Sequence, residues 1–83
     1  MVSRMVGYFA YSIAGRDKEH IYLIIKEETE SVWLVDGKIR TLRKPKRKNK
    51  KHIQIIKKQN LENSLDSITD EQIKYAISRL VKD

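Results

Sequence analysis

The apolar residues of this 83-residue chain fall into short runs separated by turn residues over most of its length. Three such runs, residues 5–12, 20–26 and 31–35, are rich in aromatic or β-branched side chains, which favour strands. The middle run has five consecutive apolar residues, Ile21 to Ile25, so both faces of its strand are expected to be covered. We therefore predict three strands, of which the second forms the main wall of the core.

Two further strands are expected after the third run. Asp36-Gly37 is the strongest short-range hairpin signal in the chain, because a type I′ turn needs two positive φ values. Residues 38–42 would then return antiparallel as a fourth strand, with Ile39 on its inner face. Alternation of apolar and polar side chains over residues 52–56 predicts the fifth strand.

The end of the chain has helical spacing. Thr69 and Gln72 fit the first and last positions of a capping box. Apolar side chains then recur on a single face, at Ile73, Ala76, Ile77, Leu80 and Val81. Because a helix of about 13 residues is marginal in isolation, we expect this face to pack on the sheet.

Five short strands followed by one helix predict a mainly β fold, a small SH3-like barrel with a C-terminal α-helix. A chain of 83 residues has room for one small domain. We expect residues 1–56 to form the barrel with a basic loop at 43–51. Residues 57–68 would be a linker, and residues 69–83 the helix packed on the barrel.

The charge of the chain is concentrated in one segment. Residues 38–58 hold eleven Lys or Arg and no Asp or Glu, so the rest of the chain carries −4 to give the net charge of +7. Seven of the nine residues at 43–51 are cationic and none is apolar, which predicts a mobile surface loop. A solubilising loop or a targeting tag would have this composition too. The segregation of charge nevertheless favours a polyanionic partner, most commonly nucleic acid.

Other functions have little support in the composition. The absence of Cys excludes disulfides and thiolate metal sites and predicts an intracellular, cytoplasmic protein. The two His lie 32 positions apart, and there is no Gly-rich phosphate loop, so we expect no enzyme activity, metal, cofactor or small-molecule substrate. Residues 1–14 contain no apolar run long enough to span a bilayer, so no membrane association is expected.

Several motifs together resemble one family. Residues 14–18 (Ala-Gly-Arg-Asp-Lys), residues 35–38 (Val-Asp-Gly-Lys) and the Lys-Pro-Lys run at 44–46 are similar to the KOW-domain RNA-binding proteins. More narrowly, the chain resembles small bacterial relatives of KOW-type large-subunit ribosomal proteins over about residues 5–56. The resemblance implies an SH3-like barrel that binds RNA, chiefly ribosomal RNA, with ribosomal proteins as further partners. The family usually has Gly at the position of Glu19, which shifts our expectation of RNA contact toward the later basic loop.

The candidate RNA-binding residues are cations from the first loop, implied by the resemblance, and from the basic segment. They are Arg16, Lys18, Lys38, Arg40, Arg43, Lys44, Lys46, Arg47, Lys48, Lys50 and Lys51. Lysines are expected to act as point charges on phosphates, and the arginines to add finer recognition through bidentate bonds. The alternative is an SH3-like protein-interaction module whose basic loop meets an acidic partner surface.

The aromatic residues leave one question open. Tyr8, Tyr11 and Tyr22 are expected to pack in or beside the core. Trp33 faces outward if Val32 and its neighbour Leu34 face inward. It would then meet either RNA, as a stacking platform, or the C-terminal helix.

Overall fold

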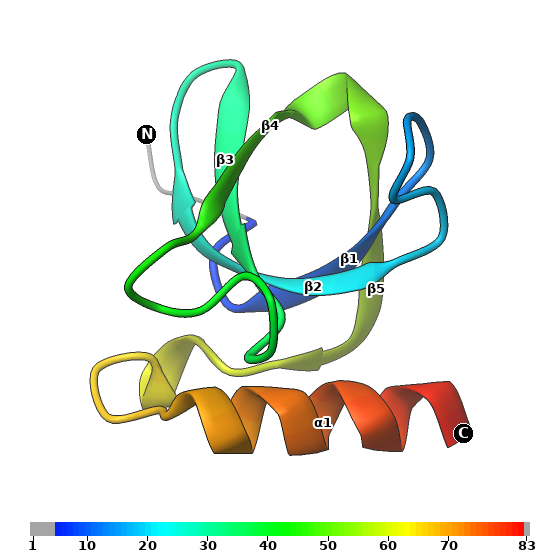
Figure 1. The fold of residues 1–83 in the computed structure, drawn as a ribbon. Helices are drawn as coiled ribbons and strands as arrows, with labels where there is room; N and C mark the ends of the chain where they lie inside the picture. Colours follow the sequence, from blue (N-terminus) through cyan, green and yellow to red (C-terminus); the bar gives the residue numbers. More distant parts are fainter. Residues whose placement is uncertain (1–4, 83) are drawn as a thin grey trace.

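The structure is a computed structural model that describes residues 5–82. It consists of a five-stranded antiparallel sheet and one α-helix (Figure 1). The strands are β1 (Tyr8–Ser12), β2 (Ile21–Glu27), β3 (Ser31–Val35), β4 (Lys46–Asn49) and β5 (Ile53–Asn60). Two short 3₁₀ turns, η1 (Lys50–His52) and η2 (Glu62–Ser64), precede and follow β5, and the helix is α1 (Asp70–Lys82). The prediction of a mainly β fold with a C-terminal helix is confirmed.

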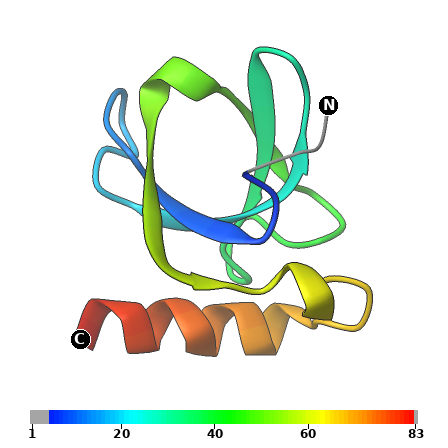
Figure 2. The same cartoon turned by 180° about the vertical axis from the view of Figure 1, so that it is seen from behind.

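The sheet is strongly bent, and its strand order is β4-β3-β2-β1-β5. The last strand returns to pair with the first, Ala10 facing Ile55, while β4 pairs only with β3. The two edge strands β4 and β5 are not hydrogen-bonded into a closed ladder, so the sheet remains open. Its concave face looks away from α1, which lies along the outer face (Figures 1 and 2).

Each face of the sheet has its own apolar core. The inner core consists of Ala10, Tyr22, Ile24, Val32, Leu34 and Ile53. The outer core, between the sheet and α1, is built on Phe9, Leu23, Val35 and Ile73. Successive residues of β2 alternate between these cores, because side chains of a strand point to opposite faces. The expectation that both faces of this strand are covered is therefore confirmed.

The helix begins as its sequence predicts. The Thr69 backbone N–H donates to Gln72 Oε1 at 3.0 Å, and the Gln72 N–H donates to Thr69 Oγ1 at 3.2 Å, which completes the capping box. Ile73 is fully buried, and Ile77 packs against the same core. Only the last position of the predicted apolar face differs, because Val81 is 68% exposed.

The predicted fourth strand at residues 38–42 is wrong, since this segment forms bends and turns. Gly37 has a φ of 80°, but Asp36 does not share the positive φ that a type I′ turn requires. The Asp36 carboxylate instead accepts the backbone N–H groups of Lys38 and Arg40, both at 2.9 Å. These donors are thereby withdrawn from any strand ladder, and Ile39, expected on the inner face, is 79% exposed.

The predicted basic loop at residues 43–51 is also wrong, because β4 lies within it. Lys46 pairs with Leu34 and Lys48 with Val32, both on β3. Pro45 immediately precedes β4, at a position where its missing N–H removes no ladder bond. The most cationic segment of the chain is thus an edge strand and not a loop.

The predicted boundary between sheet and linker lies too early. The fifth strand, expected over residues 52–56, continues to Asn60. Residues 57–60, assigned to the linker, therefore belong to the sheet. The connection to α1 begins at Leu61 and contains η2.

Candidate nucleic-acid interface

Two lysines of β4 point into the protein and not into solvent. Because paired residues of neighbouring strands share a face, Lys46 and Lys48 lie on the same inner face as their partners on β3. Their Nζ atoms each lie 2.9 Å from a carboxylate oxygen of Asp17, in the β1–β2 loop. The two lysine side chains are only 27% and 11% exposed. They bind the chain's own carboxylate, which limits what they offer to a partner.

Asp17 is the centre of a polar network on the concave side of the sheet. Besides the two lysines, it accepts hydrogen bonds from Ser12 Oγ at 2.9 Å and from Tyr22 Oη at 2.8 Å. Burial by itself would raise the pKa of Asp17. The hydrogen bonds from the lysines, Tyr22 and Ser12 outweigh burial and hold that pKa well below its ordinary value. Burial and the neighbouring Asp17 charge together raise the pKa of Tyr22. The network therefore contains an ionised carboxylate that joins the first loop to β4.

Two more cations of the basic run have acidic partners. Arg47 Nε donates to Glu28 Oε1 at 2.9 Å, and Lys50 Nζ lies 2.7 Å from Glu27 Oε2. With Lys46 and Lys48, four of the seven cations at residues 43–51 are paired within the chain. The expectation of a mobile cationic segment, free to meet phosphates along its whole length, is therefore wrong.

A second acidic residue joins the β1–β2 loop to the segment that follows β3. His20 Nε2 lies 2.7 Å from Asp36 Oδ2, and the His20 ring packs edge-on against Tyr22 with centroids 4.7 Å apart. Asp36 is only 5% exposed, and burial would raise its pKa. Hydrogen bonds from the backbone of the following loop and from His20 outweigh this effect and lower the pKa. The end of the β1–β2 loop is thus joined to the start of the segment that follows β3.

The exposed cations of these two loops are together called the basic rim. It consists of Arg16, Lys18, Lys38, Arg40, Arg43 and Lys44. Within residues 5–82, none of the six forms an ion pair with a carboxylate. Of the three acidic residues in the same loops, Asp17 and Asp36 are engaged as described, and Glu19 is exposed. The six cations of the rim are therefore exposed and available to an anionic partner. Lys51, the remaining candidate, is exposed in η1.

The cations can be identified from the sequence, but not the carboxylates that pair with some of them. Lys46 and Lys48 are 29 and 31 positions from Asp17, so no local pattern connects them. The role of Asp36 had a local signal, because an Asp side chain commonly bonds the backbone two residues on. The division of the basic segment into paired and unpaired cations depends on tertiary structure alone.

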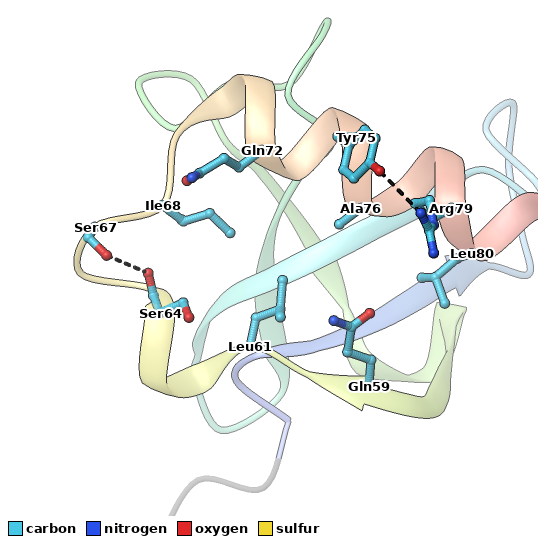
Figure 3. A pocket seen from close by; sticks show the side chains of 10 residues that line it. All are labelled: Gln59, Leu61, Ser64, Ser67, Ile68, Gln72, Tyr75, Ala76, Arg79 and Leu80. Carbon is cyan, nitrogen blue, oxygen red and sulfur yellow. Dashed lines mark hydrogen bonds between the residues drawn. The ribbon is translucent and has the colours of Figure 1, made fainter.

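A groove of about 570 Å³ lies elsewhere, between α1 and the segment that runs from β5 through η2 (Figure 3). Leu61 and Ile68 line one side, and Tyr75 and Arg79 line the helix side. Arg79 Nη1 donates to Tyr75 Oη at 3.1 Å. No residue of the basic rim borders this groove, so it is separate from the candidate interface.

Within residues 5–82, no group of three or more His, Asp or Glu is arranged to hold a metal ion. The same part of the chain contains no helix long and apolar enough to cross a membrane. Comparison with models of known protein families and with curated proteins finds no match to this chain.

Proposed function

We propose that this chain is an RNA-binding protein of the SH3-like KOW type, associated with ribosomal RNA, and that the basic rim contacts phosphates. The observation that carries the proposal is that two loops, joined through His20 and Asp36, expose six cations that have no acidic partner among residues 5–82. Such a surface attracts a polyanion and gains free energy by releasing its counterions. The paired cations of β4 would support the rim by fixing the loops and would contribute less to binding.

Two features support the KOW-like assignment. The strand order brings β5 back to β1 in a strongly bent sheet of five strands, as a small barrel-like fold requires. Glu19 has a φ of 74°, a conformation that suits glycine, and it stands where KOW proteins usually have glycine. A glycine-like backbone at this position is compatible with the resemblance even though the residue differs.

The proposal is tested by fluorescence anisotropy with a labelled fragment of structured ribosomal RNA, titrated at several salt concentrations. We expect affinity to fall steeply with salt, with a log–log slope of about −0.7 to −0.9 for each phosphate neutralised. Replacing Arg43 and Lys44 by Ser should weaken binding at low salt by roughly ten-fold and make the slope shallower by about one to two.

The matched control replaces Lys57 and Lys58, two exposed cations on β5, by Ser. It removes the same charge from another part of the surface, and we expect it to change affinity by less than about three-fold. Equal losses in the two variants would show that binding depends on net charge and not on the rim. Absence of RNA binding even at low salt would refute the proposal. Capture of an acidic protein that survives nuclease treatment would then favour the alternative interaction module.

A further inference from the structure

Trp33, at the centre of β3, faces outward from the sheet. Its neighbours Val32 and Leu34 are fully buried in the inner core, so the indole between them points to the outer face. Val35, two residues on, packs on the outer core against α1, but Trp33 belongs to neither core. Figure 1 shows why: α1 crosses below the end of β3, and the middle of this strand lies above the helix. Trp33 is therefore not part of the core beneath the helix, and its side chain is half-buried.

Cations flank the indole on both neighbouring strands. Lys26 on β2 and Arg47 on β4 are the residues paired with Trp33 across the sheet. Directly opposed side chains lie about 5 Å apart at Cβ, so the side chains of both cations leave the sheet next to the indole. Lys26 is exposed, and Arg47 is 59% exposed even with its bond to Glu28. An aromatic ring between two cations suits a nucleic-acid strand, which offers bases to stack and phosphates to pair.

The polar edge of the indole is turned away from solvent. Trp33 Nε1 is buried and has no hydrogen-bond partner among residues 5–82, whereas the side chain as a whole remains partly exposed. The exposed part of the ring is therefore carbon. A ligand there would meet apolar atoms of the ring, which favours stacking over recognition of base edges.

We infer that Trp33, between Lys26 and Arg47, is a stacking platform for an unpaired nucleobase of the RNA bound at the basic rim. This inference depends on the proposed function and narrows its ligand to RNA with a single-stranded segment. Trp33 precedes Asp36 by three residues, about 10 Å along β3, so a strand leaving the rim reaches the indole within two or three nucleotides.

The chain has one Trp, so its intrinsic fluorescence reports on this position alone. The protein is titrated at low salt with a 12-nucleotide single-stranded RNA, with a 12-base-pair RNA duplex and with poly-glutamate. Stacking should quench the emission strongly with the single strand and much less with the duplex. Poly-glutamate, a polyanion without bases, should leave the emission nearly unchanged. Equal quenching by all three polymers would overturn the inference.

Variants provide a second readout in the same anisotropy assay. Trp33→Ala should weaken binding of the single strand by about ten-fold and leave duplex affinity nearly unchanged, whereas Trp33→Phe should lose less than about three-fold. Tyr75→Ala, which removes an aromatic residue 63% exposed on α1, is the control and should bind like the original chain. Circular dichroism checks that each variant is folded.

The outcomes separate the inference from the proposed function. The stacking platform would be refuted if RNA binds the original chain without changing its emission and binds Trp33→Ala with the same affinity. The proposal for the basic rim would still hold in that case. Absence of binding by every RNA would refute both. Loss of affinity in Trp33→Ala and Trp33→Phe alike, without quenching in the original chain, would assign Trp33 a packing role.

Discussion

Glu19 is the only residue other than glycine with a positive φ between residues 5 and 82. A side chain with a β-carbon disfavours this conformation by about 1 kcal/mol or more, and glycine adopts it without strain. The position is fixed by neighbouring bonds, because the Glu19 N–H donates to the Ser12 carbonyl at 2.6 Å and the His20 N–H donates to the Asp17 carbonyl at 2.9 Å. The loop therefore keeps a strained residue in place.

Replacing Glu19 by Gly should raise the free energy of unfolding by about 0.5–1 kcal/mol, because relief of strain exceeds the added flexibility of the unfolded chain. Urea unfolding at neutral pH measures the effect. Glu19→Gln is the control: it removes the same charge and keeps the β-carbon, so its stability should stay within about 0.5 kcal/mol of the original. If Gly and Gln have the same effect, charge and not backbone strain governs this position.

At the scale of elements, the sequence predicts those parts whose partners are close in the chain or periodic. β2, β3 and the capped start of α1 lie where the apolar runs and the capping signal place them. The segment after β3 differs because one carboxylate, Asp36, captures the backbone donors that a strand would need. The candidate site on β4 differs because Asp17, far away in the sequence, neutralises two of its lysines. The amino-acid composition does not reveal this pairing.

The contact between the loop at Gly37 and α1 is a second feature that the sequence does not reveal. A β-carbon on Gly37 would overlap the Asp70 carbonyl oxygen and come within 2.9 Å of the Lys74 nitrogen. Leu42 strengthens the same contact, because its N–H donates to Asp70 Oδ1 at 2.9 Å. The missing side chain of Gly37 thus lets the backbone of this loop approach the first turns of the helix.

Gly37→Ala should therefore destabilise the protein by about 2–4 kcal/mol, since it combines an unfavourable φ with displacement of α1. Gly15→Ala is a matched control: Gly15 has a similar φ of 87°, but its β-carbon would meet no atom closer than 3.6 Å. We expect this control to lose only about 1 kcal/mol. Thermal unfolding followed by circular dichroism compares the two, and equal losses would mean that the helix accommodates the added methyl group.

At the scale of the whole molecule, one half-buried carboxylate, that of Asp17, organises the charge. The sheet is not closed by hydrogen bonds between β4 and β5, yet Asp17 links the β1–β2 loop to β4 across the concave face. The same bonds withdraw two lysines from solvent, so the candidate interface consists of the cations that remain. Stability and the position of the β1–β2 loop thus depend on one network.

Asp17→Asn should lower the free energy of unfolding at pH 7 by about 2–4 kcal/mol, because it leaves Lys46 and Lys48 partly buried without a counter-charge. This loss of stability should become smaller as the pH falls. In the folded chain the pKa of Asp17 lies well below the ordinary value of 3.8, so below pH 3.8 the unfolded state takes up a proton that the folded state does not. The advantage of Asp17 over Asn is therefore full above about pH 5 and shrinks by about 1.4 kcal/mol for each pH unit below 3.8.

Urea unfolding of both proteins between pH 2 and pH 7 tests this dependence, with Glu28→Gln as the control. Glu28 pairs with an Arg47 side chain that is 59% exposed, so its loss should change stability by less than about 1 kcal/mol at any pH in this range. A constant difference between Asp17→Asn and the original chain from pH 7 to pH 2 would contradict a lowered pKa. Similar effects of Asp17→Asn and Glu28→Gln would mean that the two carboxylates contribute alike, and that the concave network does not hold the molecule together.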